Sequence, residues 1–135
     1  MMANFDPKLT EIVARDPRYA YEAYEFIDRA LQYTQKRLGR ERTAEVPVGH
    51  PRLHVSGREL LEGARQLALI EFGMMARVVL RMWGIERTDD FGNIVFNLVE
   101  AGLMSKSDND RPDDFRSVFN FDEGLAYDIQ FDEAR

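Results

Sequence analysis

The stretch DPRYAYEAYEFIDRALQYTQKRLG, residues 16–39, carries the clearest helical pattern in this chain of 135 residues. Asp16-Pro17 is typical of a helix start, because an aspartate caps the first turn and a proline there loses no hydrogen bond. Gly39 is typical of a helix end. The pattern predicts a helix over 17–38, whose apolar face recurs every three or four residues as Ala20, Ala23, Tyr24, Ile27, Leu31, Thr34 and Leu38.

The same kinds of helix start and end signals predict four further helices, over 7–15, 57–72, 74–83 and 88–101. Asp6-Pro7 opens the first, and Ser56 has the capping-box spacing to Glu59 before the second. Thr88 is the expected cap of the last, with two aspartates in its first turn, where the helix dipole favours negative charge. We therefore expect a single, mainly α-helical domain of about five helices over residues 1–135.

Two segments lack this helical pattern. Residues 40–55 contain two prolines and a glycine and are expected to form an internal loop. Residues 105–135 form an acidic C-terminal segment in which Phe119–Phe121 and Tyr127–Phe131 alternate polar and apolar positions. With a glycine at 124 between them, they favour a short β-hairpin, although a short helix competes with it.

Composition narrows the classes of function. The net charge is −6. It is concentrated at the C-terminal end, because residues 101–135 carry 4 Lys and Arg against 9 Asp and Glu. Such a surface repels nucleic acid and anionic lipid. The chain has no cysteine, so disulfides and thiolate metal sites are excluded. With no secretory signal and no membrane-spanning apolar run, we expect a cytoplasmic protein that does not bind membranes.

Asp90-Phe91-Gly92 matches the magnesium-binding motif of protein kinases. A kinase also needs a glycine-rich loop, a strand lysine and a catalytic H-R-D loop, and the chain has none of them. A helical interpretation explains each residue, with the aspartate in the first turn and the phenylalanine on the apolar stripe. The glycine then marks a close approach by a neighbouring helix. We interpret this motif as structural.

No metal site is expected. His50 and His54 have the spacing of helical metal ligands, but Pro51 lies between them and no third ligand is evident. The acidic run Asp108–Asp114 has the composition of a calcium loop without its order of ligands. Nor does any serine, histidine or carboxylate arrangement suggest a catalytic residue, and no cofactor motif occurs.

Helix 88–101 nevertheless has a polar face, formed by Asp90, Asn93, Asn97 and Glu100. One alternative is a small-ligand or enzyme site on this face, completed by His50 or His54. A second alternative is a winged helix over residues 56–131 that binds nucleic acid with helix 88–101. The absence of Lys and Arg from 88 to 105 disfavours nucleic acid, because a groove-reading helix normally contacts phosphate and guanine with cations.

Tyrosines are concentrated on the helix predicted over 17–38. Four of the five in the chain lie there or at its start: Tyr19, Tyr21, Tyr24 and Tyr33. They cover more of the helix circumference than one core stripe needs, and half-exposed tyrosines are favoured at protein interfaces. They are therefore candidate interface residues. The alternative is that this helix is central and buried on two sides.

Several motifs also carry a resemblance: Ser56–Gly63, Phe72-Gly73, Trp83–Ile85, Arg87-Thr88 and Asp90–Glu100. By these the sequence resembles a family of small conserved hypothetical proteins of planctomycete and verrucomicrobial bacteria, most strongly over Val55–Leu103. The resemblance implies a free-standing bacterial domain. It transfers no activity, ligand or catalytic residue. The residues themselves lead us to expect a non-enzymatic protein-interaction module that binds a protein partner or a second copy of itself.

Overall fold

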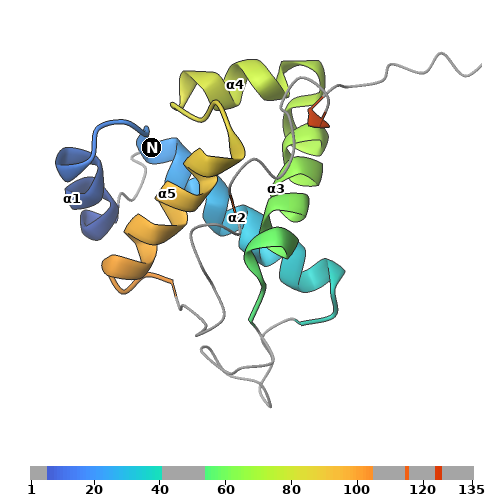
Figure 1. Cartoon of the computed structure of the whole chain (residues 1–135), viewed down its shortest axis with the longest axis horizontal. Helices are drawn as coiled ribbons and strands as arrows, with labels where there is room; N and C mark the ends of the chain where they lie inside the picture. Colours follow the sequence, from blue (N-terminus) through green and yellow to red (C-terminus); the bar gives the residue numbers. More distant parts are fainter. Residues whose placement is uncertain (1–5, 41–53, 105–114, 116–123, 126–135) are drawn as a thin grey trace, which may run out of the picture.

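The computed structural model describes residues 6–40, 54–104, 115 and 124–125. They form helices α1 (Pro7–Arg15), α2 (Tyr21–Arg37), α3 (Gly57–Phe72), α4 (Ala76–Met82) and α5 (Thr88–Glu100), with a short 3-10 turn, η2 (Gly73–Met75), between α3 and α4 (Figure 1). The described residues contain no strand. The mainly α class is confirmed, whereas the winged-helix alternative is not. Loop residues 41–53 and both strands of the predicted hairpin lie outside the described residues.

Helix α2 is the centre of the molecule. It packs against α1, α3 and α5, and α4 lies across the end of α3 (Figure 1). Its fully buried side chains include Tyr24, which bonds to Asn97 of α5, and Phe26, which packs against Phe72 of α3. The core also includes Phe115 and Leu125 from the C-terminal segment. The sequence alternative of a central helix buried on two sides therefore matches the structure.

The start of α2 corrects the sequence prediction. Asp16 does not cap α2 but ends α1, since its backbone N–H donates to the carbonyl of Ile12 at 2.8 Å. Its carboxylate instead accepts from the backbone N–H of Arg18, and α2 begins only at Tyr21. The N–H of Ala20 donates to the carbonyl of Trp83 at 3.0 Å. That contact is made across 63 residues of chain, so local capping rules do not detect it.

Most of the other helix ends follow the predicted signals. The side chain of Asp6 accepts from the N–H of Lys8 at 2.8 Å, with proline at the first helical position. Ser56 and Glu59 form the predicted capping box. The four glycines expected to end helices all have positive φ: Gly39, Gly73, Gly84 and Gly102. These ends are local in origin, which is why sequence patterns predict them.

Helices α2 and α3 are in close contact at Gly63. A Cβ at this position would lie 1.7 Å from the Oγ1 of Thr34, so only glycine fits. Further along the two helices, Arg29 donates two hydrogen bonds to the carboxylate of Glu71, at 3.0 and 3.1 Å. At the α4 end, the rings of Phe26, Phe72 and Trp83 pack in a mutual cluster with centroid separations of 5.5 to 5.9 Å. Together these contacts fix α3 against α2.

Gly84 anchors the turn between α4 and α5. Its φ is +93°, and a Cβ there would lie 2.1 Å from the backbone carbonyl oxygen of Arg18. A side chain at this position would be strained and would also collide with rigid backbone. The turn is thus held against residues 18–20, which sets where α5 begins relative to Tyr19.

Candidate functional site

Three polar residues of α5 meet the start of α2 and the turn before it. Asp90, Asn93 and Asn97 come from successive turns of one helix face. Asp90 also acts as the cap of α5, because its Oδ2 accepts from the backbone N–H groups of Glu86 and Arg87 at 2.9 and 3.0 Å. The cap is therefore the third residue of the helix and not Thr88, which is buried at the first position.

Tyr19 is the centre of the first hydrogen-bonded group. Its hydroxyl donates to the Oδ1 of Asp90 at 2.6 Å and accepts from the Nδ2 of Asn93 at 2.9 Å. The ring is 1% exposed, and the guanidinium of Arg18 lies over it, 5.2 Å from its centroid. Burial, followed by the hydrogen bond to Asp90, raises the pKa of Tyr19 to about 12. The hydroxyl is therefore neutral at pH 7.

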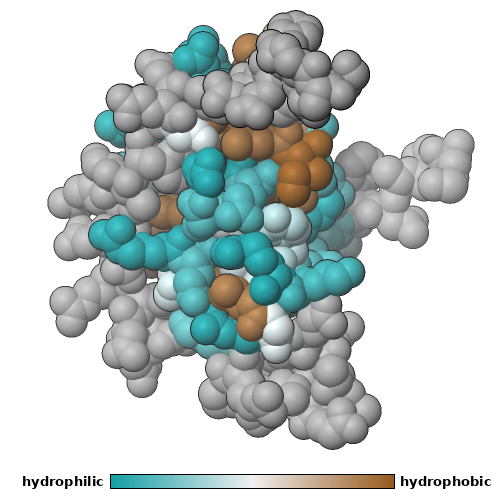
Figure 2. Space-filling model, turned by 90° about the vertical axis from the view of Figure 1, so that its right-hand side faces the viewer, coloured by the Kyte–Doolittle hydropathy of each residue, from teal (hydrophilic) through white to brown (hydrophobic). Residues whose placement is uncertain are grey.

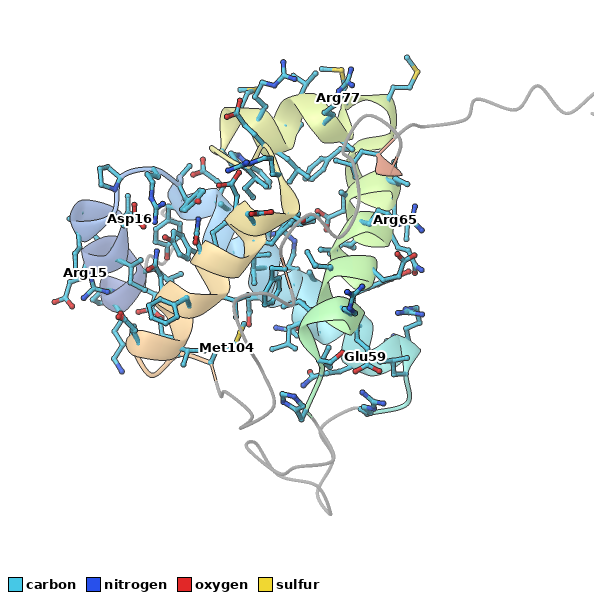
Figure 3. The ribbon with its side chains drawn as sticks, in the orientation of Figure 1. Arg15, Asp16, Glu59, Arg65, Arg77 and Met104 are labelled. Carbon is cyan, nitrogen blue, oxygen red and sulfur yellow. The ribbon has the colours of Figure 1, made fainter. Side chains whose placement is uncertain are left out.

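Asn97 is the centre of the second group. Its Nδ2 lies 2.9 Å from the Oδ2 of Asp16 and 3.0 Å from the hydroxyl of Tyr24, and it donates to both. Arg18 binds the same aspartate with two side-chain hydrogen bonds, at 2.8 and 2.7 Å. This pairing holds the pKa of the Asp16 carboxyl well below its usual range. Burial raises the pKa of Tyr24. Asp16 is labelled in Figure 3, between α1 and α5.

We call these residues the α5 polar network: Asp16, Arg18, Tyr19, Tyr24, Asp90, Asn93 and Asn97. Within the described residues, no buried side-chain nitrogen or oxygen lacks a hydrogen-bond partner. A magnesium ion at Asp90 would compete with two backbone donors and a tyrosine hydroxyl for the carboxylate. Glu100, the fourth residue of the predicted polar face, is exposed and has no bond in this network. The network holds α5 against the start of α2 and the turn before it. The hydroxyl of Tyr19 is protonated near neutral pH, so it does not serve as a general base there.

The tyrosine interface predicted from sequence is wrong for Tyr19 and Tyr24, because both are 1% exposed. Tyr21 and Tyr33 are partly buried and also bond within the chain. The hydroxyl of Tyr21 accepts from the N–H of Asp6 at 2.6 Å, and that of Tyr33 donates to Gln66 at 3.0 Å. The sequence analysis treated the tyrosines and the polar face of α5 as two separate sites, but Tyr19 and Tyr24 bond to that face.

The structure does not bring His54 to the polar face of α5. Its carbonyl accepts from Arg40 at 3.2 Å, and Arg40 also binds Glu59 at the start of α3. Figure 3 shows Glu59 and Asp16 at opposite sides of the molecule. His50 lies outside the described residues. In the part of the chain that the structure describes, no three histidine, aspartate or glutamate side chains are grouped so that they could hold a metal ion.

A different surface was missed by the sequence interpretation. Large apolar side chains are exposed along the end of α3, η2 and α4, and we call this surface the methionine face: Ile70, Met74, Met75, Val78 and Met82. Met82 is 76% exposed and Ile70 is 67% exposed. Met75, Val78 and Met82 are spaced by three and four residues, so they share one side of the helix. Figure 2, which shows the right-hand side of the molecule as drawn in Figure 1, has apolar surface near its top, at the level of α4.

Two exposed arginines of α4, Arg77 and Arg81, flank the methionine face, and α4 has no carboxylate. Figure 3 labels Arg77 on α4, above α3. The face therefore combines apolar and positively charged side chains. The cluster of methionines at 74, 75 and 82 was visible in the sequence, but methionines are more often core residues.

No protein-family model, no curated protein and no solved structure matches the chain. The resemblance to small planctomycete and verrucomicrobial proteins therefore stays a prediction. Among the described helices, none is both long and apolar enough to cross a bilayer.

Proposed function

We propose that this protein is a non-enzymatic protein-interaction module and that the methionine face is its contact surface. The observation that carries the proposal is the gathering of five exposed apolar side chains within residues 70–82. A contiguous exposed apolar patch is a common mark of a protein-binding surface. Methionine is frequent at such surfaces, because its flexible and polarisable side chain adapts to different partners.

The chemistry of the face indicates the kind of partner. Arg77 and Arg81 border the apolar stripe, so a segment that combines apolar and acidic side chains complements it. The α5 polar network supports the non-enzymatic part of the proposal, because its side chains already bond to one another. It also argues against nucleic-acid binding through α5, since the side chains of Asp90, Asn93 and Asn97 bond within the α5 polar network. We further propose a bacterial, cytoplasmic protein related to the family that it resembles.

The test compares three full-length proteins immobilised and exposed to bacterial lysate. These are the wild type, the double variant Val78→Asp/Met82→Asp, and the control Phe96→Asp. Phe96 is 54% exposed on α5, so its substitution makes a similar change on another surface. We expect the wild type and the control to retain a partner that the double variant loses. The retained protein is then purified, and its binding to all three chains is measured by calorimetry.

Circular dichroism and thermal unfolding show whether each variant keeps its fold. Equal calorimetric binding to the wild type and to the folded double variant would contradict the proposal, as would the absence of any retained protein from a wild type that is also monomeric. Light scattering of the wild type, measured over a range of concentrations, covers the case in which the partner is a second copy. A dimer that the double variant abolishes supports the methionine face as the contact surface.

A further inference from the structure

Methionine sulfur is concentrated on the methionine face. Three of the four methionines in the described residues lie there, on η2 and at the end of α4, and they are exposed at 64% (Met74), 54% (Met75) and 76% (Met82). The fourth, Met104, is partly buried and packs against the core. Figure 3 labels Met104 near the end of α5, on the side of the molecule away from α4. The protein thus has one group of exposed thioethers and, elsewhere, a partly buried one for comparison.

Exposed thioethers react with peroxides in a two-electron step. A lone pair of the methionine Sδ attacks one oxygen of hydrogen peroxide, and the S–O bond forms as the O–O bond breaks. The departing hydroxide takes up the proton that the transferred oxygen releases. The thioether is thereby oxidised to a sulfoxide, and the peroxide is reduced to water. No thiol of this chain competes for the oxidant, because the chain has no cysteine.

We propose that the methionine face is an oxidation site, at which hydrogen peroxide converts Met74, Met75 and Met82 to sulfoxides in the folded protein. Sulfoxide formation turns a flexible apolar side chain into a polar one. Of the five side chains of the face, only Ile70 and Val78 stay apolar after the reaction. Oxidation therefore removes most of the exposed apolar patch.

The fold itself is expected to survive this reaction. The side chains that α4 buries are those of Ala76 and Leu80, which contain no sulfur. The reacting side chains are each more than half exposed, so their new oxygen atoms are solvated by water and are not forced into the core. The oxidised protein thus keeps its helices and changes one surface.

A consequence for partner binding rests on the proposed function, because it requires the methionine face to be the contact surface. An apolar partner would lose the burial of three methionine side chains and would meet polar oxygens in their place. Burial of one such side chain is worth about tenfold or more in affinity, so the oxidised protein should bind at least about tenfold more weakly. Methionine sulfoxide reductases restore the thioether, so the change is reversible.

The experiment treats the folded, full-length protein with hydrogen peroxide and follows each methionine by mass spectrometry after removal of the peroxide and digestion with trypsin. Trypsin cleaves after Lys and Arg, so Met74 and Met75 lie in peptide 66–77, Met82 in peptide 82–87 and Met104 in peptide 88–106. Each sulfoxide adds about 16 Da, and fragment spectra distinguish Met82 from Trp83. We expect the first two peptides to react several-fold faster than the third. In guanidinium, where the fold gives no protection, all three should react at similar rates.

Hydrophobic-interaction chromatography measures the change in the surface. Oxidised wild type should elute earlier than untreated protein, with the same circular dichroism. The matched control is the triple variant Met74→Leu/Met75→Leu/Met82→Leu, which keeps an apolar face of similar volume and has no sulfur there. It still contains Met104, and peroxide should leave its elution unchanged.

Three outcomes overturn the inference. One is that Met104 is oxidised in the folded protein as fast as the three methionines of the face. Another is that the oxidised protein loses its helical circular dichroism. The third is that peroxide shifts the elution of the wild type and of the leucine variant equally, or shifts neither.

The proposed function fails or holds separately. The absence of any partner would leave the peptide and elution results as they are. A partner whose binding depends on positions 78 and 82 should bind the oxidised wild type at least about tenfold more weakly and the peroxide-treated leucine variant with unchanged affinity. Equal binding to the oxidised and untreated wild type would overturn the consequence for partner binding.

Discussion

The substitution Tyr19→Phe tests whether the polar face of α5 serves to hold the fold together. It leaves the ring in place and removes only the hydroxyl, which bonds to Asp90 at 2.6 Å and to Asn93 at 2.9 Å. A hydrogen bond to a charged group contributes about 1.5–3 kcal/mol and one to a neutral amide about 1 kcal/mol. Since Asp90 keeps two backbone donors, we expect the free energy of unfolding to fall by about 2 kcal/mol.

Urea unfolding at pH 7 measures this change. With a dependence on denaturant of about 1–3 kcal/mol per molar urea, the midpoint should drop by about 1 M. The matched control is Tyr24→Phe, because that ring is equally buried and its hydroxyl accepts only from the amide of Asn97. Its loss should cost about 1 kcal/mol. The expected order is therefore a larger loss at position 19 than at position 24.

The pH dependence gives a second readout. The pKa of Tyr19 is raised from 10.0 to about 12 in the folded protein, so the folded state holds this proton more tightly than the unfolded state does. Its contribution to stability is fully present below pH 10 and is lost as the pH rises from 10 to about 12. Phenylalanine has no such proton. The stability difference between wild type and variant should therefore shrink over that range.

Two results would refute this reasoning. The first is an unfolding free energy for Tyr19→Phe within about 0.5 kcal/mol of the wild type at pH 7, which is typical of an unimportant surface change. The second is a stability difference that stays constant from pH 9 to pH 12. Either would mean that the bonds between Tyr19 and α5 contribute little to stability, and a ligand-binding role for the polar face would again be open.

Three further substitutions test the packing. Gly63→Ala should destabilise the protein by about 1–3 kcal/mol through overpacking against Thr34. In a double-mutant cycle, adding Thr34→Ala should recover part of that loss, and strictly additive effects would argue against the contact. Gly92→Ala places a Cβ 2.8 Å from the Cβ of Phe115, so thermal unfolding should show a loss of stability. That loss should be smaller in a Phe115→Ala background, and an unchanged loss there would point to another cause. Ser56→Ala should lower stability by about 1 kcal/mol in urea unfolding by removing the cap of α3, and no change would mean that the capping box is unimportant.

Much of the fold was predictable because its signals are local. Helices 7–15 and 57–72 were predicted with the bounds that the structure has, since each begins with a side-chain cap and ends near a residue that closes it. The helical interpretation of Asp90-Phe91-Gly92 is confirmed in that Asp90 lies in the first turn of α5 and Phe91 is buried. The neighbour at Gly92 is a side chain, Phe115, and not the helix that we expected.

The candidate sites were less predictable, for two physical reasons. Whether a tyrosine is exposed depends on what covers it, and Tyr19 is covered by contacts with Asp90 and Asn93, more than 70 residues away. The methionine face was missed for the opposite reason. Met74, Met75 and Met82 look like core residues in sequence, but they are exposed, and α4 buries Ala76 and Leu80 instead.

The amino-acid sequence by itself determined the helical class, most helix ends and the absence of thiol chemistry, since these depend on residue type and on neighbours within a few positions. Only the tertiary structure decided which polar side chains face each other and which apolar side chains face water. The hydroxyl of Tyr19 and the carboxylate of Asp90 meet because the positive φ of Gly84 lets the turn before α5 lie against the backbone of Arg18. That close approach between distant parts of the chain has no counterpart in any local pattern.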